Sequence, residues 1–250
     1  MTQIAILSVA AFLTSTLSAI IGMGGGITLL AIMILFLPWK VLIPIHGCVQ
    51  LISNATRVAS FIKYVNWKIF LIFILACIPA SYIGLKAVGQ FDETLVKAFI
   101  GVFILYAVFL APKLKEAIAR IFKSFFLAGT LAGSISMVVG ATGPLIAPFF
   151  INSNLKKEEI IATKALCQTM VHLIKVILFG ALLGFSISDY SKLLAFMSVG
   201  VILGTFSGKW ILENKISDRL FRFLYKFVLG AVAVKILVYD SFYLGYWILQ

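Results

Sequence analysis

Apolar stretches close to 20 residues long recur along the chain, separated by short polar segments. Stretches of this length match the hydrocarbon thickness of a bilayer, so they predict membrane-spanning helices. The first half is predicted to contain a glycine-interrupted segment at 4–37 and helices at 41–62, 67–88 and 94–111. After a basic linker at 112–123, the second half is predicted to contain an interrupted segment at 124–151 and helices at 160–185, 190–212 and 220–240.

The two halves of the chain resemble each other. The first contains FLTSTLSAIIGMGGGI and the second contains FLAGTLAGSISMVVGATGPL. One constant offset aligns Gly22 with Gly140, Gly25 with Gly143, Gln50 with Gln168, Asn54 with His172 and Arg57 with Lys175. Internal duplication is typical of secondary transporters. We therefore predict a first transmembrane repeat at 1–111, a basic cytoplasmic linker at 112–123 and a second transmembrane repeat at 124–250.

The positions of the basic residues distinguish two orientations of the repeats. If each interrupted segment crosses the membrane once, the repeats are parallel, and a cytoplasmic linker leaves the basic residues of 156–157 and 209–226 outside. If each is a hairpin, the repeats are inverted, and most of the 21 Lys and Arg residues face the cytoplasm, as the positive-inside rule favours. We predict an all-α, polytopic membrane protein. It has two inverted repeats, each a glycine-broken helical hairpin plus three transmembrane helices, with both termini outside.

The glycine clusters mark the two predicted breaks. Irregular backbone at membrane depth is tolerated where it is buried in protein or lines a cavity. Helix N-termini at such breaks offer free N–H groups and a partial positive charge to an anion. The alternative is that the glycines only permit close helix packing, but their matching positions in both halves favour a ligand site. The candidate backbone residues are Gly22, Met23, Gly24, Gly25 and Gly26, with Gly140, Ala141, Thr142, Gly143 and Pro144.

Polar residues form a stripe on the helix that follows each break. The stripes are His46, Gln50, Asn54 and Arg57 in the first half, and Lys164, Gln168, His172 and Lys175 in the second. Their spacing places each set on one helical face. Polar groups in hydrocarbon are costly, so both faces should point into the bundle. The side chains are mainly hydrogen-bond donors, without a carboxylate, which suits an anion.

The individual residues of these stripes have different expected roles. We predict that Gln50, Asn54, Arg57, Gln168, His172 and Lys175 bind the substrate, with Arg57 and Lys175 as counter-charges. His46 is expected near the outer surface. Lys164 is expected to extend its ammonium group to the membrane interface.

Composition narrows the class of protein. Hydrophobic residues make up 62% of the chain, more than in a typical soluble domain. The three cysteines show no metal-ligand or disulfide spacing, and no cofactor is indicated. The net charge of +12 points to membrane topology and anion attraction, not to nucleic acid. HExxH, GxSxG and Walker A motifs are absent from the sequence, so we expect no enzyme.

Three segments resemble the sulfite exporter TauE/SafE family of bacterial and archaeal permeases. They are IGMGGGITLL, VVGATGPLIAPFF and HGCVQLISNATRVASFIKYVNWK. The resemblance implies transport of sulfite, sulfonates and related organosulfur anions across the cytoplasmic membrane. In a G-N-V-D-W segment of the family, this chain has Asn66 in place of Asp.

Together, these patterns predict a multi-pass protein of the bacterial cytoplasmic (inner) membrane. It would export a small sulfur-containing anion by alternating access, with the lipid bilayer as its other partner. An anion channel and a non-transporting membrane enzyme or redox-system component are the alternatives. The sequence makes no prediction of the oligomeric state.

Overall fold

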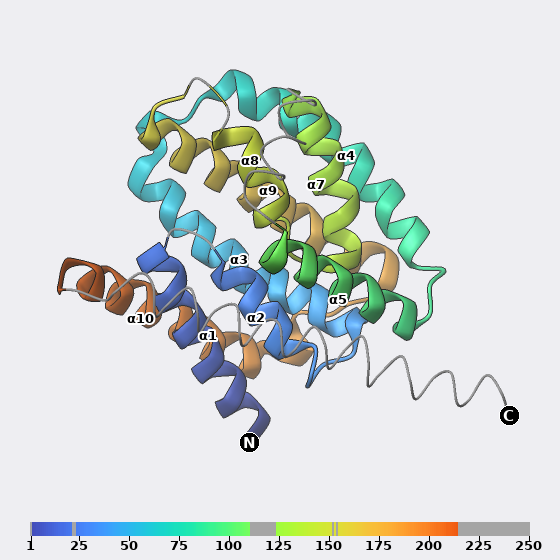
Figure 1. Ribbon diagram of the computed structural model, residues 1–250. Coiled ribbons are helices and arrows are strands. Elements are labelled where there is room, and N and C mark those ends of the chain that lie inside the picture. The colour runs from blue at the N-terminus through green and yellow to red at the C-terminus, as the bar shows by residue number, and fades with distance from the viewer. Residues whose placement is uncertain (1, 22–23, 111–123, 152, 154, 215–250) are drawn as a thin grey trace, which may run out of the picture.

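The computed structural model describes residues 2–21, 24–110, 124–151, 153 and 155–214, and its described secondary structure is entirely helical (Figure 1). The first half contains α1 (Thr2–Ile21), α2 (Gly25–Met33), α3 (Trp39–Phe61), a short 3-10 turn (Ile62–Tyr64), α4 (Trp67–Val88) and α5 (Glu93–Phe109). The second half contains α7 (Phe125–Val139), α8 (Gly143–Ile151), α9 (Lys157–Leu183), a 3-10 turn (Ser188–Tyr190) and α10 (Ser191–Asn214).

The predicted helices are confirmed to within a few residues at each end, wherever the structure describes the chain. The predicted linker at 112–123 and the last predicted helix at 220–240 lie outside the described residues. Three of the described helical stretches are long and apolar enough to cross a membrane, namely Trp67–Val88, Glu158–Leu183 and Ser188–Gly208. Their outward faces carry large apolar side chains, such as Leu75 at 68% exposure, as lipid contact requires.

Each glycine-interrupted segment folds back on itself. Near the start of α1, the Gln3 side-chain amide donates to the backbone oxygen of Phe36, just beyond α2, at 2.9 Å. At the start of α7, the Phe125 ring packs on the ring of Phe150, near the end of α8, with centroids 5.1 Å apart. In both segments the last residues therefore return to the level at which the first residues begin (Figure 1).

The two halves exchange equivalent contacts. Helix α1 packs along α10, and α7 packs along α4. These two interfaces correspond under the sequence repeat, because the first helix of each half meets the fourth helix of the other. Both use glycines to bring backbones together: a methyl group added to Gly129 would lie 2.1 Å from the Phe73 oxygen of α4, and one added to Gly204 would lie 2.2 Å from the Phe12 oxygen of α1.

Helices α3 and α9 pair at the centre of the protein and run antiparallel. Trp39, at the start of α3, contacts Phe179 near the end of α9, with ring centroids 6.2 Å apart. Beyond the other end of α3, the Asn66 backbone N–H donates to the Thr163 hydroxyl near the start of α9 at 2.9 Å. The two polar stripes therefore face each other, and their residues follow in opposite order along the helix pair.

Candidate functional site

The first backbone break lies immediately before α2. Gly24 has a φ of 98°, a left-handed value that glycine adopts without strain. Its carbonyl accepts hydrogen bonds from the Thr28 backbone N–H at 3.1 Å and the Thr28 hydroxyl at 3.0 Å. Gly26 offers its carbonyl to His46 Nε2 of α3 at 2.8 Å. The break is thus fixed by α3, and the predicted residues Gly22 and Met23 lie outside the described residues.

The second break lies between α7 and α8. Gly140 has a φ of 83°, and its carbonyl accepts a hydrogen bond from Lys175 Nζ of α9 at 2.5 Å. Helix α8 then begins at Gly143. Just before it, the Thr142 hydroxyl is buried and makes no hydrogen bond. A buried hydroxyl without a partner is costly, so this group is available to a ligand.

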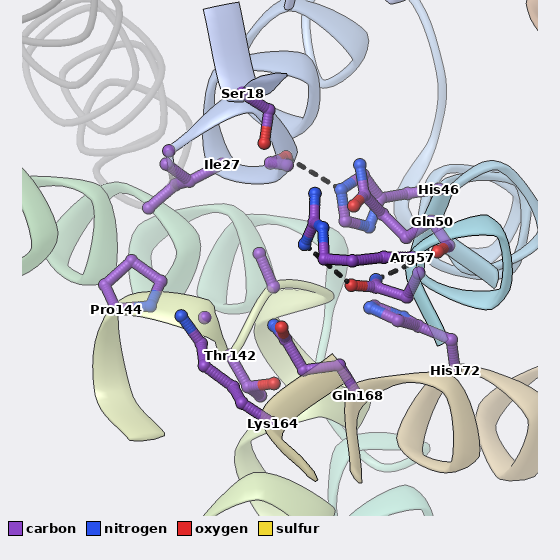
Figure 2. Close-up of a pocket in the computed structure, with 15 residues that line it drawn as sticks. Ser18, Ile27, His46, Gln50, Arg57, Thr142, Pro144, Lys164, Gln168 and His172 are labelled. Carbon is purple, nitrogen blue, oxygen red and sulfur yellow. Dashed lines mark hydrogen bonds between the residues drawn. The ribbon is translucent and has the colours of Figure 1, made fainter. Parts of the chain in front are cut away.

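A cavity of about 50 Å³ lies between the two breaks and the central helices. Figure 2 shows side chains of both halves directed into it. Its lining residues are Ser18, Gly24, Gly26, Ile27, His46, Gln50, Asn54 and Arg57 from the first half, and Ala141, Thr142, Gly143, Pro144, Lys164, Gln168 and His172 from the second. None of these described lining residues is Asp or Glu.

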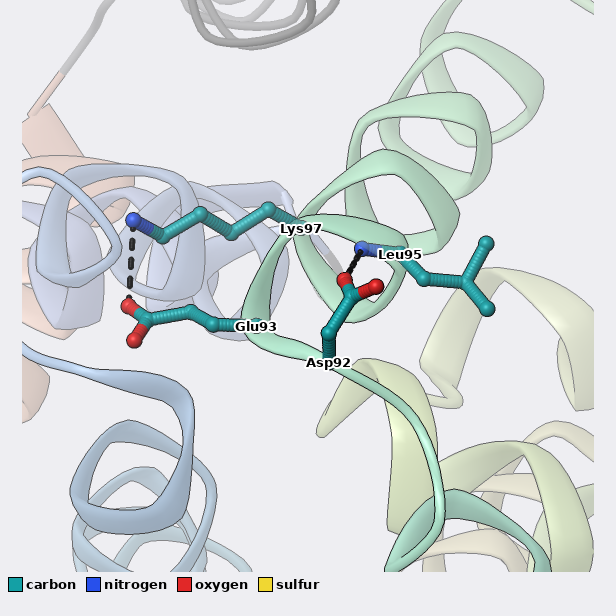
Figure 3. A network of polar contacts seen from close by, with 4 residues as sticks. All are labelled: Asp92, Glu93, Leu95 and Lys97. Carbon is teal, nitrogen blue, oxygen red and sulfur yellow. Dashed lines mark hydrogen bonds and ion pairs between the residues drawn. The ribbon is translucent and has the colours of Figure 1, made fainter. Parts of the chain in front are cut away.

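Two cationic side chains enter the cavity, one from each half. Arg57 extends from α3 and Lys164 from α9 (Figure 2), and the two interact electrostatically. The one ion pair among the described residues is elsewhere, between Lys97 and Glu93 of α5 at 3.1 Å, beside the Asp92 cap of the same helix (Figure 3). The cations of the cavity thus lack a protein counter-ion in the described part of the chain.

Amide side chains complete the walls. Asn54 donates to the Gln50 backbone oxygen at 2.9 Å and accepts from the Arg57 guanidinium at 3.4 Å. It therefore holds Arg57 in place as well as lining the cavity. The carboxamide of Gln50 lies against Gly26, and that of Gln168 lies against Gly143. Each half thus covers the start of its own short helix with a glutamine.

The structure brings most of the predicted binding residues together at this cavity. Those that line it are Gly24, Gly26, Gln50, Asn54, Arg57, Ala141, Thr142, Gly143, Pro144, Gln168 and His172. Gly25 instead packs against α1 and borders a smaller neighbouring cavity. Gly140 and Lys175 are bonded to each other and are absent from the lining. Lys175 thus points to the Gly140 carbonyl, and its role as a counter-charge stays a prediction.

Two residues of the stripes occupy places that sequence reasoning missed. His46 was expected near the outer surface, but it is fully buried and lines the cavity. Lys164 was expected to reach the membrane interface, but its side chain also lines the cavity. Ser18 and Ile27 were not singled out. The sequence did contain a signal for His46 and Lys164 as cavity residues, because their spacing places them on the same helical faces as the predicted binding residues.

These features define a polytopic helical membrane protein with a cation-lined cavity between two related halves. The chain belongs to the family described as Sulfite exporter TauE/SafE, which it matches over residues 7–236. It is therefore a multi-pass membrane protein of a transporter family. No curated protein and no solved structure matches the chain.

Proposed function

We propose that this protein exports sulfite or a closely related small organosulfur anion across the bacterial cytoplasmic membrane by alternating access. The observation that carries the proposal is the composition of the cavity. Both halves contribute a cation and amide donors, and no described lining residue is a carboxylate. Intramembrane ionisable residues usually mark a substrate pathway, and an anion is the charge that these residues would stabilise.

The size of the cavity supports a small ion. One water molecule needs about 10–15 Å³ of comparable space, and the cavity has about 50 Å³. It thus has room for about four water-sized groups, which corresponds to one sulfur and three oxygens.

The bound anion would be held by groups of three kinds. Arg57 and Lys164 would supply opposite charge, and the guanidinium of Arg57 suits two oxygens of one anion. Gln50 and Gln168 would donate amide hydrogens, and the Thr142 hydroxyl, which has no partner, would donate another. At the start of α8, the backbone N–H of Gly143 would join this set, because Pro144 has no N–H and that of Leu145 bonds to the Thr142 carbonyl.

Alternating access would use the correspondence between the halves. We propose that the repeats are inverted, with the cavity near the midplane and one hairpin on each side of it. The antiparallel α3–α9 pair, the returning hairpins and the exchanged α1–α10 and α4–α7 contacts support this arrangement. Rocking of one repeat against the other would then expose the site to each side in turn.

The inverted arrangement makes a topological prediction. In a background without Cys48, Cys77 and Cys167, a cysteine at Gln3 should react with an impermeant reagent from outside intact cells. A cysteine at Lys156 should react only after the cytoplasmic side is opened, because the inverted arrangement puts the two positions at opposite membrane faces. Both native side chains are exposed. Reaction of both cysteines from the same side would reject the arrangement.

Ligand binding tests the function. Purified protein should be stabilised against heat by its substrate, because a ligand that binds only the native state raises the melting temperature. We expect sulfite to raise the melting temperature of the protein more than chloride or taurine. Thiosulfate and sulfate would be tested in the same series. Asn54→Ala should weaken the stabilisation, because Arg57 loses its hydrogen-bond partner. Equal responses to all these ions, or none, would count against an oxyanion site and favour a partner-dependent role.

A further inference from the structure

Three basic side chains meet behind the cavity, and we call His46, His172 and Lys175 the basic cluster. Their exposed fractions are 0%, 2% and 0%. Lys175 Nζ lies 3.3 Å from His172 Nδ1, and the two imidazole rings are 5.9 Å apart, edge to face. The cluster spans α3 and α9, and both imidazole rings also border the cavity.

The hydrogen bonds define where the protons of the cluster lie. A lysine ammonium can only donate, so a charged Lys175 requires an acceptor lone pair on His172 Nδ1. His46 Nε2 contacts the Gly26 carbonyl at 2.8 Å and must carry its hydrogen to bond there. The other nitrogen, His46 Nδ1, then holds a lone pair. It is buried without a hydrogen-bond partner, so the cluster contains an unoccupied basic site.

Among the described residues, no carboxylate interacts electrostatically with the cluster to balance its charge. The ionisable groups that interact electrostatically with Lys175 are the two histidines and the thiols of Cys48 on α3 and Cys77 on α4. Helices α2, α7 and α8 carry no ionisable side chain. Arg57 and Lys164 line the cavity in which the proposed anion would bind. Two excess protons a few ångströms apart would repel strongly in this interior, so the cluster suits one.

We propose that the basic cluster binds one proton together with the anion and that both cross the membrane in the same step. The proposal rests on the proposed anion transport. An anion in the cavity lies beside His46 and His172, and a nearby opposite charge favours the protonated form of a base. By linkage, the proton favours anion binding to the same extent. A divalent anion would then cross with one negative charge fewer.

The cluster also connects the proton to both backbone breaks. His46 holds the carbonyl of Gly26 in the first hairpin, and Lys175 holds that of Gly140 in the second. Gly140 also lies next to His46, since a methyl group added to it would be 3.8 Å from His46 Nδ1. Its carbonyl is an acceptor within reach of His46 as well as of Lys175. Loss of the proton removes a hydrogen bond at the elements that enclose the anion.

Histidine-selective ¹⁵N labelling tests the cluster directly, because the chain has only 2 histidines. In lipid nanodiscs, we expect the ring signals to change with pH as the cluster takes up its proton, either on a ring nitrogen or on Lys175, which contacts His172 Nδ1, and saturating sulfite to move that change to higher pH. Lys175→Met should alter the Nδ1 signal of His172, whereas Lys192→Met at an exposed position should alter neither ring. Ring signals that do not change with pH, with and without sulfite, would overturn the proposal.

Flux measurements separate this proposal from the transport function. In proteoliposomes, an imposed pH gradient should drive uphill accumulation of ³⁵S-sulfite, after subtraction of leak into protein-free vesicles. His46→Gln and Lys175→Met should lose this coupling, because neither new side chain takes up a proton. If wild-type sulfite flux does not depend on the pH gradient, proton coupling is overturned but the proposed transport function is not. Absence of protein-dependent flux would instead overturn the transport function.

Discussion

Replacing Arg57 with glutamine is expected to weaken sulfite binding by about a hundredfold, because truncating one partner of a buried charge pair costs about 2–5 kcal/mol and each 1.4 kcal/mol is about tenfold in affinity. Arg57 is held over the cavity by Asn54, so its guanidinium is oriented before the ligand arrives. Glutamine keeps an amide donor but removes the charge and the paired N–H groups. Isothermal titration of purified protein would measure the loss.

Variants of Lys164 and Lys192 allow the loss of affinity in Arg57→Gln to be compared with the loss of a positive charge at two other positions. Lys164→Gln should weaken binding less than Arg57→Gln, since an ammonium is a flexible point charge without the planar donor geometry of a guanidinium. Lys192→Gln removes the same charge at an exposed position on α10 and should leave the affinity unchanged. Equal losses in all three variants would show a general effect of net charge, and the cavity would then not be the anion site.

Gly25→Ala is expected to cause the largest loss of stability among alanine substitutions at the first break. The added methyl group would lie 2.2 Å from the Thr14 backbone oxygen and 2.6 Å from Ser18 Cβ. Both belong to α1, so α2 must move away from it. Overpacking costs about 1–3 kcal/mol, and a clash with backbone should reach the upper part of this range. Alanine favours a helix over glycine by about 1 kcal/mol, so helix propensity alone would stabilise the variant. A loss of stability would therefore come from the clash between α2 and α1.

Two other glycines, Gly26 beside it and Gly180 near the end of α9, serve as controls for this substitution. At Gly26 the new methyl group meets only the flexible end of Gln50, at 3.1 Å or more, so Gly26→Ala should fold normally and disturb the cavity wall instead. At Gly180 the nearest atom is 3.4 Å away, and alanine should be tolerated. Melting temperatures in detergent would rank the three variants. A Gly25→Ala protein as stable as Gly180→Ala would contradict the tight α1–α2 hairpin.

Helix positions were predictable because apolar length and capping residues determine them locally. Helix α4 occupies the predicted range at both ends, and its start is fixed by Asn66, whose side-chain oxygen accepts from the Ile69 N–H. The breaks were predictable because glycine clusters disfavour a continuous helix. The observed breaks contain Gly24 and Gly140 with positive φ, a conformation that glycine adopts without strain.

The assignment of roles within the polar stripes was less predictable. Helical spacing shows which residues share a face, but not which residue of another helix meets them. The antiparallel crossing of α3 and α9 places His46 beside His172 and Lys175. It likewise places Lys164 in the same cavity as Arg57. These pairings depend on tertiary packing, so helical spacing alone did not indicate that Lys164 lines the cavity beside Arg57 and that Lys175 bonds to the Gly140 carbonyl.

Counterflow of labelled sulfite tests the proposed transport most directly. Proteoliposomes loaded with unlabelled sulfite and diluted into a trace of ³⁵S-sulfite should accumulate label transiently above its equilibrium level, because a carrier that alternates between two sides exchanges bound ligand. Arg57→Gln should abolish this overshoot, and Lys192→Gln should preserve it. Entry of label without an overshoot would indicate a channel, and an undiminished overshoot in Arg57→Gln would place the anion site outside the cavity.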